Sequence, residues 1–159
     1  MTDTPYRHTQ RGRATLLACG LGCVAMLAVL LVAPQPIPAG AIAAVAFATS
    51  VMLFCAWAFS ALTVEVTERE LSWYFGPNVL RRRIPLAEIA SATPIRTTLW
   101  QGIGIHWMGA WLYNVAAGDA VEVVTVAGKR VRIGTDEPVA LANTIERAAR
   151  DAARGHRQV

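Results

Sequence analysis

The chain has 159 residues, a formal net charge of +4, 54% hydrophobic residues and only 16% charged residues. A soluble domain of ordinary composition carries about 25% charged residues, so this composition excludes a typical soluble globular protein. The deficit lies in one region, because no Asp, Glu, Lys or Arg occurs between Arg13 and Glu65. Such a long uncharged region is typical of a membrane protein.

The uncharged region predicts a two-helix transmembrane hairpin over residues 14–62, preceded by a basic tail at residues 1–13. Residues 14–33 supply 20 apolar or small side chains, which at about 1.5 Å per residue match the hydrocarbon core of a bilayer. The segment PQPIP that follows holds three prolines and cannot continue a helix. Residues 39–62 are long enough to cross back with some tilt.

The basic residues predict the orientation of this hairpin. They flank it on both sides and are missing from its proline-rich turn: Arg7, Arg11 and Arg13 precede it, and Arg69 and Arg81–Arg83 follow it. Positive flanks stay in the cytoplasm, so we expect a multi-pass protein of the inner (cytoplasmic) membrane with both termini cytoplasmic. Trp57 and Phe59 are then expected at the inner interface. The alternative, a cleaved signal peptide, has an apolar run of only about 7–15 residues, so we expect both helices to be retained.

Small residues recur at helical contact spacing in both spans: Ala18 and Gly22 in the first, and Ala39, Ala43, Ala46 and Ser50 in the second. Small residues let membrane helices approach closely. Because the two helices are neighbours in sequence, the pattern favours packing within the hairpin over a dedicated dimerisation motif.

Residues 63–159 change to a pattern of period two, which predicts a cytoplasmic domain of hairpin-linked antiparallel strands. Val64 and Val66 alternate with polar neighbours, and turns such as TERE and GPN separate the runs. The expected strands are 63–67, 71–75, 79–84, 88–96, 111–116, 120–127 and 130–135.

A helix over about residues 136–154 closes the chain. Thr135 or Asp136 is suited to cap it, and Leu141, Ile145 and Ala152 give it an apolar stripe. With so few residues, these elements bury the most surface as an α+β domain, a bent antiparallel sheet or partial barrel with the helix over one open end.

This order of elements resembles the pleckstrin-homology-like (PH-like) fold, and most closely the bacterial PH-like domains that follow a two-helix membrane hairpin. The resemblance covers Leu62 to about Ile145 and is carried by LTVEVTERELSWYFGP, RRRIPLAEIASA, GIGIHWMGAWLYNVAAGDAVEV and KRVRIGTDEPVALANTI. It implies a membrane-tethered binding or assembly module and no reaction. PH domains that hold inositol phosphates place basic residues at the first strand turn. Here that turn contains Glu68 and Glu70, which repel a phosphorylated headgroup.

Two basic and aromatic groups are the candidate contact residues for the membrane or a partner. On a strand, Arg81 and Arg83 share one face and Arg82 takes the other, so the triplet meets anionic lipid or forms a solvated sheet edge. The uncharged stretch from Leu99 to Val115 is rich in tryptophan, and its rings either fill the core or rest at the headgroup layer. We expect Trp111 to be structural, and the candidate contacts to be Trp100, His106 and Trp107, with Arg96 nearby.

No catalytic motif is visible in the sequence. The stretch GIGIHW lacks the remainder of a nucleotide-binding pattern, and His106 has no Ser, Cys or carboxylate near it in sequence. The spans hold no ionisable side chain that would mark a transport path. We therefore expect no enzyme, cofactor, metal or nucleic-acid partner. The expected function is a membrane-anchored interaction module that binds a protein partner or itself. The alternatives are a component of a membrane enzyme or transport complex, or a sensor of anionic lipid.

Overall fold

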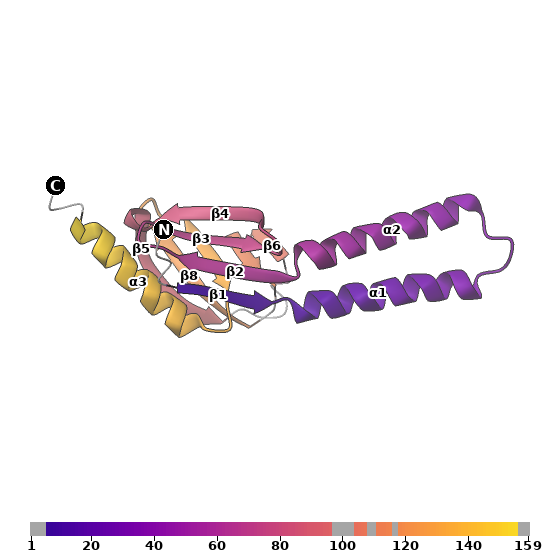
Figure 1. Cartoon of the computed structure of the whole chain (residues 1–159), viewed down its shortest axis with the longest axis horizontal. Coiled ribbons are helices and arrows are strands. Elements are labelled where there is room, and N and C mark those ends of the chain that lie inside the picture. Colours follow the sequence, from indigo (N-terminus) through magenta and orange to yellow (C-terminus); the bar gives the residue numbers. More distant parts are fainter. Residues whose placement is uncertain (1–5, 97–103, 108–110, 116–117, 156–159) are drawn as a thin grey trace.

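The computed structural model describes residues 6–96, 104–107, 111–115 and 118–155. Two long helices project side by side from one end of a domain made of two β-sheets and a C-terminal helix (Figure 1). The whole arrangement is elongated, with the helix pair as a stalk and the strands gathered at its base.

The stalk consists of α1 (Arg13–Val32) and α2 (Ala39–Ala58). Both helices are long and apolar enough to cross a membrane, as their length and composition show. They touch closely at Gly22, where a Cβ atom would lie 2.7 Å from the Met52 sulfur. The predicted close approach at Gly22 is therefore confirmed. The second helix ends four residues earlier than expected, because the chain turns into a strand at Ala61.

The first sheet has the order β1-β2-β3-β4 and is antiparallel throughout. Its strands are β1 (Tyr6–Arg11), β2 (Ala61–Val66), β3 (Glu70–Phe75) and β4 (Val79–Pro85). Strand β1 is a departure from the expected basic tail. It pairs along its full length with β2, from Tyr6 opposite Val66 to Arg11 opposite Ala61. The hairpin is thus inserted between two neighbouring strands of one sheet.

The second sheet has the order β5-β8-β9-β7-β6. Its strands are β5 (Ile89–Arg96), β6 (Gly104–Trp107), β7 (Trp111–Asn114), β8 (Asp119–Thr125) and β9 (Arg130–Gly134), and the short helix η1 (Leu86–Glu88) joins the two sheets. The expectation of a wholly antiparallel sheet is wrong at one place, since β7 runs parallel to β9. The β6–β7 hairpin lies at the far side of β9, so the chain crosses back to form β8. In the described part of the chain the sheets stay open and form no closed barrel.

The core lies between the two sheets and under helix α3 (Pro138–Gly155). Leu71, Trp73 and Phe75 point inward from β3, and Leu141 and Ile145 meet them from α3, all of them buried. Complete burial of a leucine, isoleucine or phenylalanine side chain contributes about 1.5–3 kcal/mol to the stability of the fold. The predicted apolar stripe of the terminal helix is confirmed, and it packs on β5, η1 and β8. In the described part of the chain, α3 does not cover β4 and β7 in this way.

Candidate functional site

The junction between the helix pair and the sheet is almost without linker. Only Gly12 separates β1 from α1, and two residues separate α2 from β2. The Gly12 N–H donates a hydrogen bond to the Ser60 carbonyl at 2.8 Å, which ties the two chain crossings together. A Cβ atom on Gly12 would lie 2.5 Å from the Phe59 carbonyl oxygen, so the backbones are in direct contact there. The stalk and the sheet therefore meet at a close-packed junction.

The turn between β3 and β4 braces this junction. Gly76 has φ +45°, a left-handed conformation that glycine adopts without strain, and its Cα faces the carbonyls of Trp57 and Ala58 at the end of α2. Phe59 turns toward the domain and packs edge-on against Phe75, with ring centroids 5.1 Å apart. Phe59 thus contacts the sheet domain, whereas Trp57 is 54% exposed on the last turn of α2.

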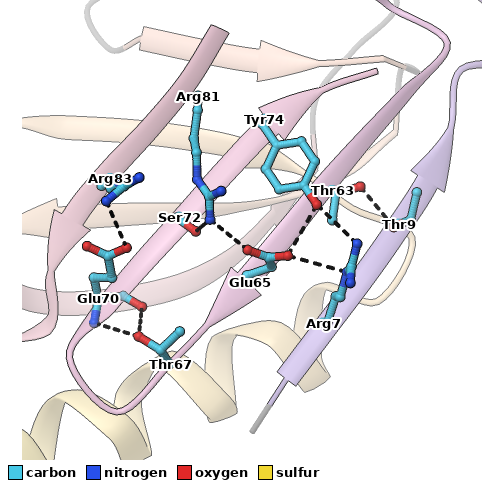
Figure 2. A network of polar contacts seen from close by, with 10 residues as sticks. All are labelled: Arg7, Thr9, Thr63, Glu65, Thr67, Glu70, Ser72, Tyr74, Arg81 and Arg83. Atoms are coloured by element: carbon cyan, nitrogen blue, oxygen red, sulfur yellow. Dashed lines mark hydrogen bonds and ion pairs between the residues drawn. The ribbon is translucent and has the colours of Figure 1, made fainter. Parts of the chain in front are cut away.

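The outer face of the first sheet carries a network of paired charges centred on Glu65 (Figure 2). Arg81 on β4 reaches Glu65 with 2.8 Å between guanidinium nitrogen and carboxylate oxygen, and Arg7 on β1 reaches it at 3.3 Å. The Tyr74 hydroxyl donates to the same carboxylate at 3.2 Å and accepts from Arg7. Two arginines from opposite edges thus close over one carboxylate that is only 15% exposed.

Other polar side chains on this face are also paired with one another. Arg81 also donates to the buried Ser72 hydroxyl at 3.2 Å and lies over the Tyr74 ring, 5.1 Å from its centroid. Arg83 pairs with Glu70 at 3.7 Å. As the alternation predicts, Arg81 and Arg83 share one face, and both have carboxylate partners. Their predicted contact with anionic lipid remains a prediction.

Arg82 lies on the opposite face of β4 and lines a slot between the two sheets. The slot has a volume of about 400 Å³. Most of the residues that line it are aromatic or apolar: Trp73, Ile84, Trp111, Tyr113, Ala127 and Val131, with the polar Thr125 among them. The other lining residues are charged and mostly basic: Arg82, Arg83, Lys129 and Glu88. Sequence reasoning missed this slot, although the alternation along β4 did indicate that Arg82 points away from its neighbours.

The remaining predicted contact residues are dispersed. Arg96 ends β5, is largely exposed and pairs with Asp119 at 3.3 Å. His106 and Trp107 lie on the edge strand β6, with their side chains outside the described part of the chain. Trp100 lies outside the described residues, so the choice between core and headgroup contact stays open for it. Trp111, expected as structural, is 46% exposed at the slot.

A second polar cluster joins β1 to the loop before α3. His8 contacts Asp136 at 2.5 Å and Glu137 at 3.6 Å, and the Tyr6 hydroxyl donates to Glu137 at 3.3 Å. Burial, followed by the charge of Glu137, raises the pKa of Tyr6 to about 12. This cluster connects β1 to the loop before α3. In the sequence, only the two acidic residues before Pro138 indicate it.

These places present ionic groups, hydrogen-bonding groups and aromatic rings. Among the described residues, no group of three or more His, Cys, Asp or Glu side chains is placed to hold a metal ion. Comparison of the chain with models of protein families, with curated proteins and with solved structures gives no match.

Proposed function

We propose that the chain is a membrane-anchored interaction module that carries a PH-like domain on the cytoplasmic face of a bacterial inner membrane. The observation that carries this proposal is the insertion of the apolar hairpin between β1 and β2. Because α1 and α2 adjoin the same end of the β1–β2 pair, the two flanks of the hairpin lie on one side of the bilayer. Their arginines assign that side to the cytoplasm.

The close-packed junction supports a platform with a fixed orientation. A domain on a flexible linker samples many orientations, whereas here Gly12, Ser60 and Gly76 bind the sheet directly to the helix ends. Fixing a binding surface before the encounter reduces the ordering cost of association. Such an arrangement suits assembly with a partner that is itself at the membrane.

The charge pairing on the first sheet favours a protein over a lipid headgroup as the partner of that face. A headgroup site needs cations that are free to meet phosphate, but Arg7, Arg81 and Arg83 already have carboxylate partners. A face on which positive and negative side chains alternate and pair with one another is more typical of a protein–protein contact, in which charge complementarity fixes register. The partner is a protein or a second copy of the chain.

Cysteine labelling tests the topology. In a background where Cys19, Cys23 and Cys55 are replaced by Ala, Gln35→Cys in the hairpin turn should react with an impermeant maleimide added to intact cells. Ala127→Cys, in the exposed β8–β9 turn, should react only after the membrane is opened. Labelling of Ala127→Cys in intact cells would overturn the assignment of sides.

Photo-crosslinking in native membranes tests the interaction. A photoreactive residue at position 83, on the outer face of the first sheet, should yield a discrete adduct with a protein or with a second copy. The same residue at position 90, exposed on β5, is the matched control and should not give that adduct. Lipid adducts alone, or identical patterns from both positions, would contradict the proposal.

A further inference from the structure

The slot between the sheets is lined by two cations, Arg82 and Lys129, that have no carboxylate partner among the described residues, whereas its third cation, Arg83, pairs with Glu70. The Trp73 side chain is 2% exposed, and its indole N–H finds no hydrogen-bond partner among the residues that the structure describes. A buried N–H without a hydrogen-bond acceptor lowers the stability of a fold by about 1–3 kcal/mol, so such groups are rare in native structures. Trp73 lines the slot and packs edge-on against Tyr113, with ring centroids 5.3 Å apart.

Arg82 adds a charge beside this donor. It stands directly opposite Trp73 in the β3–β4 pairing, on the inward face of an edge strand where Ile84 is buried. Within the described part of the chain, neither Arg82 nor Lys129 has a carboxylate within ion-pair distance. An inward charge on an edge strand does discourage pairing with other chains. That role explains neither Lys129, which comes from the opposite sheet, nor the indole N–H.

We propose that this slot binds a small anion that carries a planar ring. The side chains of Arg82 and Lys129 are the donors that a phosphate or carboxylate group needs. Trp111 and Tyr113 supply the aromatic wall against which a flat ring packs. A volume of about 400 Å³ falls within the usual range of small-molecule sites, about 300–1,000 Å³. Glu88 at the edge disfavours a second anionic group, so the ligand has one.

Calorimetric titration of the full chain in nanodiscs of zwitterionic lipid tests this site. Two probes carry a ring and an anion, AMP with a phosphate and indole-3-acetate with a carboxylate. Adenosine and inorganic phosphate each carry one half. The slot should bind at least one of the two ring-bearing anions at least about tenfold more tightly than either half alone, and the stronger of the two identifies the anionic group.

Variants locate the binding. Arg82→Gln and Lys129→Gln should each weaken the affinity about tenfold, whereas Arg130→Gln, the next residue along and outside the slot, should leave it unchanged. Trp73→Phe, which shrinks one of the rings that line the slot, should weaken it as well, with folding checked by circular dichroism. Arg82→Gln keeps the test valid if Trp73→Phe fails to fold.

Three results would overturn the inference: no heat from either ring-bearing anion, equal affinity for inorganic phosphate alone, or equal losses in Arg82→Gln and Arg130→Gln. None of these measurements depends on a protein partner. A failure here would therefore leave the proposed interaction function untouched, and a failure to find a partner would leave the slot untouched.

Discussion

Arg81 and Arg82 are adjacent in sequence but occupy two different environments. Arg81 lies on the outer face of the first sheet, where Glu65, Ser72 and Tyr74 satisfy it. Arg82 faces the slot, where the described residues offer it no ion-pair partner. On the outer face each of the three arginines, Arg7, Arg81 and Arg83, has a carboxylate partner within the fold, whereas in the slot Arg82 and Lys129 are available to a ligand. A run of three arginines is therefore two features, separated by the alternation of a strand.

The largest contrast is expected between two tryptophans that both line the slot. Trp73→Ala empties a buried position and should lower the free energy of unfolding by about 3–5 kcal/mol. Trp111→Ala removes a side chain that is nearly half exposed and should cost about 1 kcal/mol or less. Chemical denaturation of the full chain in detergent micelles, followed by circular dichroism, measures both. Equal losses would show that the two rings contribute equally to stability despite their different exposure.

Removing the central carboxylate of the outer face should have the next largest effect. Glu65→Gln leaves Arg7 and Arg81 without their common partner, and we expect a loss of about 1–3 kcal/mol. Glu88→Gln in the slot is the matched control, because the described residues give Glu88 no ion pair, and it should be close to neutral. The same denaturation experiment applies. If Glu65→Gln left the free energy of unfolding unchanged, the network would make no contribution to stability.

The two neighbouring arginines themselves give a smaller and more direct comparison. Arg81→Gln should cost about 1 kcal/mol, since it breaks a 2.8 Å ion pair that is only partly exposed. Arg82→Gln should leave stability within about 0.5 kcal/mol of the parent. Thermal unfolding of both variants side by side checks this. Greater loss from Arg82→Gln than from Arg81→Gln would reverse the assignment of paired and unpaired faces.

The smallest expected effect concerns pH at the opposite edge of the first sheet. The pKa of Tyr6 is raised to about 12 from an ordinary 10.0, so the fold favours the neutral phenol. This stabilisation is complete below about pH 10 and is lost as the pH rises through about 12. Tyr6→Phe cannot ionise there, and its stability should fall less than that of the parent between about pH 10 and about pH 12. Parallel pH profiles would show that Tyr6 ionises as freely in the fold as outside it.

Periodicity was sufficient to predict most of the elements. The apolar runs marked both long helices, and alternation marked β2 to β5 and the β8–β9 hairpin, all within a few residues of their observed limits. The terminal helix and its buried Leu141 and Ile145 followed from the helical stripe. These features depend on residues that are close together in sequence, so the local pattern of apolar and polar residues is enough to predict them.

The missed features depend on residues far apart in sequence. Strand β1 reads YRHTQR, which has no apolar alternation, and its only pairing partner lies beyond the whole hairpin. The parallel pairing of β7 with β9 and the slot arise from the crossover of the second sheet. No short window of the sequence contains both sides of such a contact, so the slot could not be predicted, although the opposite facing of Arg82 could.

The insertion of the hairpin also orders the events of synthesis. Strand β1 is made first, but its partner β2 is made only after both helices, so the pair cannot form locally as an ordinary hairpin does. A chain whose helices cross a bilayer and return brings β1 and β2 to the same side, and only then is the edge of β2 covered. If only one helix is inserted, β1 stays on the opposite side of the membrane from β2. The edge of β2 is then left unpaired and open to aggregation and proteolysis. Under the proposed topology, completion of the first sheet would distinguish correctly inserted copies from failed ones.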